Sequence, residues 1–304
     1  MIMRRLFVAL SSAVSVVALT HMASAADLGP RIVYKAPPPP PPVQDWSGVY
    51  VGVEGGYGWG KQDFDPAFNF FQLPFVPSSA FPFPTISSVN QSGWLAGGFA
   101  GVQKQWGSWV LGLEAEVDGA DIKGSTTATG TQSFSVAPGA PIGKTLTLTL
   151  NESINSKVDE LAYVGPKVGW AFGPNWMVYV TGGAAWAHKE DTASESATLT
   201  CSPGTSTDNN GRCFSSDSFA LAFGPQSGAV SMFGYAVGGG LDYKWQLDPG
   251  SAVIFGVKYL HYGFGDNTLT LVNNQFTNAE SLSFNTKESV DLVVGRISYL
   301  FSIH

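Results

Sequence analysis

The sequence is poor in cysteine and in charged residues. Of its 304 residues, 2 are cysteine and 13% are charged, whereas 13% are aromatic and 36 are glycine. The formal net charge is −7 and the basic residues form no stripe, which argues against nucleic acid as a partner. After the first 25 residues, no run of about 18 consecutive apolar residues occurs, so the rest of the chain offers no transmembrane helix.

Residues 1–25 have the three parts of a secretory signal peptide. Arg4 and Arg5 supply a positive start, residues 6–19 are mostly apolar, and residues 23–25 fit the small-residue cleavage rule. The apolar run is too short to span a bilayer, so we expect cleavage after Ala25 rather than a buried N-terminal helix. The mature chain is therefore expected to be exported.

The two cysteines are Cys201 and Cys213, and the segment between them is rich in turn-forming residues. An exported chain meets an oxidising compartment, where we expect this pair to close a disulfide. The alternative is half of a metal site, but no histidine lies near in sequence and no C-x-x-C motif occurs.

Residues 26–45 form a proline-rich segment with an unbroken proline run from 37 to 42. Such a run adopts an extended polyproline II conformation. We interpret the segment as a periplasmic linker in front of the first strand. The alternative is a ligand for a periplasmic protein.

Residues 46–304 show a period of two. In residues 109–118 one face is apolar and the other largely acidic. In residues 233–245 apolar side chains alternate with glycine, alanine and two charged residues. A face of glycine and a few charges suits a narrow barrel interior better than the surface of a soluble sandwich. The pattern predicts an all-β protein with eight strands, at 46–60, 91–105, 109–123, 157–172, 176–190, 231–247, 251–265 and 287–301.

Short and long connections alternate between the predicted strands. Tight turns occur at 106–108, 173–175 and 248–250, with the Gly, Pro, Asn and Asp residues that turns favour. The long connections are 61–90, 124–156, 191–230 and 266–286. This layout is typical of an antiparallel up-and-down transmembrane β-barrel with periplasmic turns and long extracellular loops.

Aromatic residues gather near the predicted periplasmic strand ends. Outer-membrane barrels carry aromatic girdles at the membrane interface. We assign to such a girdle Trp46, Trp106, Trp109, Trp176, Trp245, Tyr299 and Phe301.

Several segments resemble one family of outer-membrane barrels. They are WSGVYVGVEGGYGWG after the proline run, WLAGGFAGVQKQWGSWVLGLEAEVDGA, VGPKVGWAFGPNWMVYVTGGAAWA and the closing KESVDLVVGRISYLF. These segments are similar to the porin-like proteins called outer membrane immunogenic proteins. The resemblance implies an eight-stranded barrel like the OmpA transmembrane domain, a location in the cell outer membrane and surface antigenicity. In that family the chain usually ends on the aromatic residue of the last strand, whereas residues 302–304 follow Phe301 here.

Counting the strand phase places charged side chains in the lumen. They are Glu114, Glu116, Asp118, Lys167, Asp242, Lys244, Lys258 and Arg296. Charges buried in a narrow barrel need partners of opposite sign. We interpret them as a salt-bridge plug, because side chains can fill an eight-stranded barrel. The alternative is a gated polar pathway.

The first long connection is rich in phenylalanine. Its members are Phe64, Phe68, Phe70, Phe71, Phe75, Phe81 and Phe83. An exposed apolar segment of this size needs a contact. Either it folds over the barrel mouth as a small core, or it docks lipid, an aromatic cofactor such as haem, or a host or neighbouring protein.

The mature chain has three histidines, His188, His261 and His304. No nucleophile motif accompanies them, and no carboxylate is convincingly placed to orient them. We therefore expect no enzymatic activity, no cofactor and no metal.

These features predict a non-enzymatic outer-membrane protein with a structural and surface-interaction role. The expected partners are outer-membrane lipid and lipopolysaccharide, with a surface ligand or host protein recognised by the loops. A narrow porin for small solutes is the alternative, and a lipid-processing enzyme is less favoured. The chain ends with its last predicted strand, so we expect no separate periplasmic domain.

Overall fold

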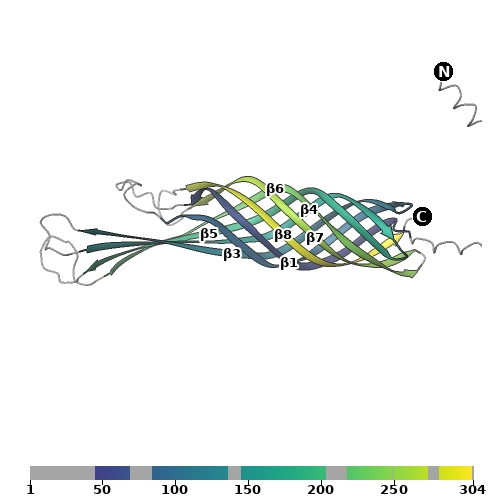
Figure 1. The fold of residues 1–304 in the computed structure, drawn as a ribbon, viewed down its shortest axis with the longest axis horizontal. Coiled ribbons are helices and arrows are strands. Elements are labelled where there is room, and N and C mark those ends of the chain that lie inside the picture. The colour runs from purple at the N-terminus through teal and green to yellow at the C-terminus, as the bar shows by residue number, and fades with distance from the viewer. Residues whose placement is uncertain are drawn as a thin grey trace, which may run out of the picture. The chain divides into compact units, whose positions relative to one another are not determined.

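The computed structural model describes residues 45–68, 84–135, 145–202, 218–248, 250–272 and 281–302. The predicted signal peptide, nearly all of the proline-rich linker and His304 lie outside these residues. The eight strands are β1 (Gly48–Phe68), β2 (Ile86–Trp106), β3 (Trp109–Ser135), β4 (Thr145–Phe172), β5 (Trp176–Ser202), β6 (Ser218–Asp248), β7 (Ser251–Val272) and β8 (Ser281–Ser302). Each pairs antiparallel with the next and β8 pairs with β1, which closes the barrel (Figure 1). The predicted fold class is confirmed.

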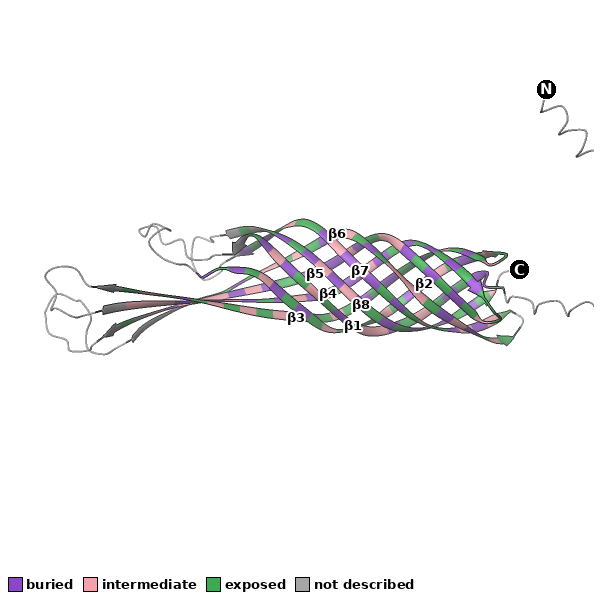
Figure 2. Ribbon diagram, in the orientation of Figure 1, coloured by how far each residue is buried: buried purple, intermediate pink, exposed green. Residues whose placement is uncertain are grey.

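Burial alternates residue by residue along the strands, as the sequence pattern predicts. In β4, the odd-numbered residues from Leu161 to Ala171 are buried, whereas the even-numbered ones are exposed or half-buried. Figure 2 shows this alternation around the barrel wall. Two of the tight turns contain glycines with positive φ, Gly107 and Gly173, both at 61°. Glycine takes this conformation without the steric cost that a Cβ brings.

The outer face of the barrel is apolar over a broad band. Side chains such as Val53, Val117 and Val180 are 60–63% exposed on it. An exposed apolar surface of this extent, around a charged interior, is typical of strands that face lipid. No helix in the described part of the chain is long and apolar enough to cross a bilayer.

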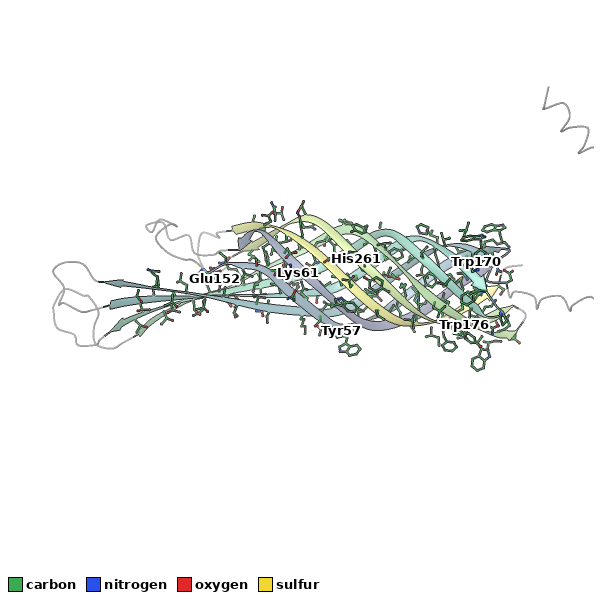
Figure 3. All side chains as sticks on the ribbon, in the orientation of Figure 1. Tyr57, Lys61, Glu152, Trp170, Trp176 and His261 are labelled. Carbon is green, nitrogen blue, oxygen red and sulfur yellow. The ribbon has the colours of Figure 1, made fainter. Side chains whose placement is uncertain are left out.

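Two aromatic groups border this band. Near the tight turns, at the turn end, lie Trp106, Trp109, Trp170, Trp176, Trp245, Tyr299 and Phe301. Farther along the strands lie Tyr57, Trp59, Trp94, Phe233, Tyr235 and Tyr259. This second group and Trp170 were not predicted. Figure 3 shows Trp170 and Trp176 at the turn end and Tyr57 farther along the barrel. The assignment of Trp46 to a girdle was wrong, because this side chain is 0% exposed in the lumen.

The predicted long loops were also partly wrong, because much of their length forms strand. Residues 124–135 belong to β3 and 145–156 to β4, and 191–202 and 218–230 likewise extend β5 and β6. The first three of these segments are rich in Thr and Ser, and β-branched Thr is common in strands.

Strands β3, β4, β5 and β6 continue beyond the point where the pairing of β2 with β3 ends. The pairing of β2 with β3 ends at Ser92 and Lys123, whereas β3 and β4 stay paired to Ser135 and Thr145. The β4–β5 and β5–β6 pairings continue similarly. Figure 1 shows these strands as a narrow sheet. We call residues 124–135, 145–156, 191–202 and 218–230 the extension.

Candidate functional site

The barrel interior consists of apolar clusters separated by charged ones. The apolar cluster at the turn end includes Trp46, Tyr50 and Phe99, and a second one includes Leu161, Met232 and Leu292. A third, toward the extension, includes Phe64, Ile154 and Leu271. The register places charged side chains between the first and second clusters, and again between the second and third.

The charged residues between the first two apolar clusters form what we call the central cluster. Its members are Glu54, Glu114, Glu116, Asp118, Lys167, Asp242, Lys258 and Arg296, and each is at most 7% exposed. Seven of these eight were assigned to the lumen from the sequence, and Glu54 was not. The alternation in β1 would have revealed Glu54, because it follows Tyr50 and Gly52 on the inward face.

Arg296 joins several members of the central cluster. Its Nη1 donates hydrogen bonds to Glu114 Oε1 at 3.0 Å and to the Tyr179 hydroxyl at 2.9 Å. Its Nε lies 3.3 Å from Glu54 Oε2. The guanidinium also stacks on the Phe99 ring, 3.7 Å from the ring centre. Arg296 therefore connects the carboxylates of β1 and β3 with the aromatic side chains of Phe99 and Tyr179.

The two lysines of the central cluster bind different carboxylates. Lys258 donates a hydrogen bond to Glu116 and lies 3.5 Å from oxygens of both Glu54 and Glu114. Lys167 donates to Asp242 Oδ2 at 2.9 Å. This arrangement suits a lumen closed by side chains, because the charges on opposite walls touch each other directly.

Lys244 is buried but lies apart from the central cluster. Its ammonium donates to the main-chain oxygen of Asp45 and faces the Trp46 ring at 5.1 Å. The Trp46 main chain is held by Gln103 and Gln105, through bonds of 2.8 and 2.7 Å. The residues just before β1 thus cover the turn end of the lumen.

The charge environment of Asp45 supports this placement. Partial burial alone would raise the pKa of its carboxyl group, but two hydrogen bonds from Ser47 and the charges of Lys104 and Lys244 hold that pKa below its ordinary value. Asp45 is therefore ionised near neutral pH and attracts both lysines.

A second charged cluster, missed from the sequence, lies between the second and third apolar clusters. Lys189 donates to Glu288 Oε2 at 2.6 Å and lies 3.4 Å from Asp191. Gln91 donates to Glu288 at 2.9 Å and Gln62 donates to Asp191 at 3.4 Å. Asp191 was missed because it follows the predicted end of its strand, although it shares the inward phase of Lys189.

The phenylalanine-rich segment is only partly described. Phe64 belongs to β1 and is 5% exposed within the third apolar cluster, so its assignment to a loop contact surface was wrong. Its position in β1 turns it inward together with Gln62. The side chains of Phe68, Phe70, Phe71, Phe75, Phe81 and Phe83 lie outside the described residues, as do those of Cys201 and Cys213.

One face of the extension carries hydroxyl and amide side chains from three adjacent strands. Cross-strand hydrogen bonds join Thr129 to Asn151 at 2.8 Å and Ser153 to Ser194 at 2.7 Å. We call this surface the hydroxyl face. The register places on it Ser125, Thr127, Thr129, Thr131 and Ser133 of β3, Thr147, Thr149, Asn151, Ser153 and Asn155 of β4, and Thr192, Ser194, Ser196 and Thr198 of β5.

A groove of about 590 Å³ lies at the base of the hydroxyl face. It is lined by Lys123, Gly124, Ser125, Asn155, Ser156, Lys157, Glu190 and Thr192. The Lys123 ammonium lies 2.8 Å from Asp121, and Lys157 pairs with Asp159. The groove therefore offers donors and acceptors with largely balanced charge.

Two histidines lie on the outer wall rather than in the lumen. His261 Nδ1 is 2.8 Å from Asp291 Oδ1, which also accepts a hydrogen bond from the Tyr259 hydroxyl at 2.6 Å. A carboxylate thus orients His261, which the sequence did not indicate. His188 Nδ1 is 3.3 Å from the Ser231 hydroxyl. Figure 3 shows His261 on the barrel wall.

No protein-family model and no curated protein matches the chain. Solved structures that match the chain include Ail, the attachment invasion locus protein of Yersinia pestis, with 10% identity and a TM-score of 0.26. The match covers 84% of this chain and 99% of that one. The outer membrane protease OmpT of Escherichia coli matches with 8% identity and a TM-score of 0.26, and the match covers 86% of this chain and 99% of OmpT. A FadL homologue of Pseudomonas aeruginosa matches with 9% identity and a TM-score of 0.24, and the match covers 84% of this chain and 91% of the homologue. The closed ring of eight antiparallel strands and its apolar outer band give this chain the fold of an outer-membrane β-barrel.

Proposed function

We propose that the protein is a non-enzymatic outer-membrane barrel that presents the extension on the cell surface for recognition. Outer-membrane barrels place their short turns in the periplasm and their long hairpins outside the cell. This orientation directs the extension away from the cell. The observation that carries the proposal is the hydroxyl face with the groove at its base.

The chemistry of this surface suits a hydroxyl-rich sugar chain. Side chains such as Thr129, Thr131 and Asn151 offer both hydrogen-bond donors and acceptors on one face of the sheet. Such a surface binds by many weak hydrogen bonds, so affinity depends on several sites acting together. A glycan displayed on a cell or on a neighbouring bacterium offers this kind of repeated contact.

A narrow porin is the less favoured reading. The ion pairs of the central cluster and the apolar clusters on both sides of it support a lumen that does not conduct. Single-channel recordings of the folded protein in a planar bilayer test this point. We expect no ionic current through the folded protein, and steady, reproducible current steps would favour the porin.

The recognition role is tested by removing hydroxyl groups from the extension while keeping β-branched side chains. We would replace Thr127, Thr129 and Thr131 together by Val and measure binding of purified protein to a glycan array. Binding should fall strongly, because the cross-strand hydroxyl surface is lost while strand propensity is kept. The control is Thr270→Val, on a hairpin of β7 and β8 away from this face. Equal binding by the triple variant and the wild type would contradict the proposal.

A further inference from the structure

The central cluster contains more negative than positive groups. Its five carboxylates are Glu54, Glu114, Glu116, Asp118 and Asp242, whereas its cations are Lys167, Lys258 and Arg296. If all are ionised, two negative charges stay unbalanced inside the barrel. Burying an uncompensated charge is costly, so the cluster requires either protons or a bound cation.

The unbalanced charge is concentrated at Asp118. This residue is 1% exposed, and neither of its carboxylate oxygens has a hydrogen-bond partner. No ammonium or guanidinium nitrogen in the described chain lies within ion-pair distance of it. Glu54 Oε1 likewise has no hydrogen-bond partner. Buried polar atoms without partners are rare in folded proteins, so these oxygens mark a place where a ligand is expected.

The oxygens converge on one point. One carboxylate oxygen from each of Glu54, Glu116 and Asp118 lies within 4.8 Å of the other two. Calcium takes oxygen ligands at about 2.3–2.6 Å, so oxygens up to about 5 Å apart can bind the same ion. Calcium accepts irregular coordination by oxygen, whereas magnesium requires a near-ideal octahedron, so a set of three carboxylates fixed by the barrel wall favours calcium.

We propose that Glu54, Glu116 and Asp118 bind one calcium ion inside the barrel. Its two positive charges would balance the two surplus negative charges of the central cluster. Asp118 and Glu54 Oε1 would supply oxygens that no other group uses, while Glu116 would share its carboxylate with Lys258 and with the Tyr262 hydroxyl. Water molecules would complete the coordination.

The neighbouring strand leaves room for the Asp118 carboxylate. Gly97 faces Asp118 across the β2–β3 pair, and a Cβ at Gly97 would lie 2.2 Å from Asp118 Oδ1. The ion would join β1 to β3, two strands that are not paired with each other. The site would therefore stabilise the barrel by joining two strands that share no main-chain hydrogen bonds.

Binding can be measured on the mature chain refolded into a zwitterionic detergent, free of lipopolysaccharide and treated with EDTA. Equilibrium dialysis with radioactive calcium should give one bound ion per barrel. Terbium, a calcium substitute, should show tyrosine-sensitised emission because Tyr262 contacts a ligand. Added calcium should raise the midpoint of thermal unfolding.

Two variants decide the interpretation. Asp118→Asn keeps the shape and removes a charge that has no ion-pair partner, so the barrel should fold but lose the bound calcium, the terbium emission and the thermal shift. Asp121→Asn, on the outer face of the same strand, should retain all three. If the wild type binds no more calcium than Asp118→Asn, the proposal is overturned. In that case Asp118→Asn should be more stable than the wild type with or without calcium, which would indicate protons in place of the ion.

Discussion

Lys167 and Asp242 form an ion pair inside the barrel, with the ammonium nitrogen 2.9 Å from Asp242 Oδ2. They come from β4 and β6, which are separated in the sheet by β5. Their side chains are 3% and 4% exposed, and the ammonium lies 4.0 Å from the centre of the Tyr179 ring. The pair therefore joins strands that share no main-chain hydrogen bonds.

Replacing Lys167 by Met should destabilise the barrel by about 3–5 kcal/mol, because Asp242 would lose its charge partner while staying buried. The measurement is urea unfolding of the protein in lipid vesicles. Replacing both residues, by Lys167→Met with Asp242→Leu, should recover most of the loss. A double variant as unstable as the single one would show that packing, and not the ion pair, sets the effect.

A surface pair provides the comparison. Lys61 and Asp63 lie 2.6 Å apart with both side chains 51% exposed. Lys61→Met should therefore change the free energy of unfolding by less than about 1 kcal/mol.

The barrel and most of its central cluster were predictable because the alternation of β3 is unambiguous. Glu114, Glu116 and Asp118 follow each other at every second residue, opposite a purely apolar face. Glu54 was missed because glycines dominate the inward positions around it. The sequence predicts that Asp118 points into the lumen. It does not reveal that no lysine or arginine of the described residues lies within ion-pair distance of Asp118, because that depends on the positions of other strands.

The end of each strand was harder to predict than its presence. Polar Thr and Ser segments were assigned to loops, although their alternation also suits a sheet exposed to water on one face. Trp46 was assigned to a girdle because it begins the first predicted strand, at the periplasmic end. Its direction depends on two hydrogen bonds with β2, one donated by Gln103 to the Trp46 carbonyl and one donated by the Trp46 N–H to Gln105. No local sequence pattern reveals these bonds.

Trp46→Ala should destabilise the barrel by about 3–5 kcal/mol, because it removes a large side chain that is fully buried. It also removes the ring that faces Lys244. The matched control is Trp106→Ala, since Trp106 is 58% exposed on the outer wall. Unfolding of both variants in the same lipid would compare them, and a larger loss for Trp106→Ala would contradict the assignment of Trp46 to the lumen.

Two adjacent glycines of β1 should differ in their tolerance of a methyl group. A Cβ at Gly56 would lie 2.0 Å from the main-chain oxygen of Val293, whereas a Cβ at Gly55 would come no closer than 3.6 Å to Leu95. Gly56→Ala should therefore separate β1 from β8 and cost about 1–3 kcal/mol. Gly55→Ala should be nearly neutral. Heat-modifiable migration on gels reports barrel closure, and equal behaviour of the two variants would refute the predicted close approach.

Glu195 should make the extension pH-dependent. Burial and the charge of Glu152, its register partner on β4, raise the pKa of Glu195 from 4.5 to about 7. Between these values the folded extension binds more protons than the unfolded chain, so its stability falls as the pH rises from about 4.5 to 7. Above that range no further change from this group is expected.

Hydrogen exchange of β4 and β5 amides at pH 5 and pH 8, corrected for the intrinsic pH dependence of exchange, measures this effect. In the wild type, protection of the extension should be weaker at pH 8. Glu195→Gln keeps the size and hydrogen-bonding capacity of the side chain but cannot ionise, so its protection should be similar at both pH values and exceed that of the wild type at pH 8. Glu190→Gln, at an exposed position of the same strand, should retain the wild-type dependence. If Glu195→Gln kept the dependence as well, another carboxyl group would have to carry the titration.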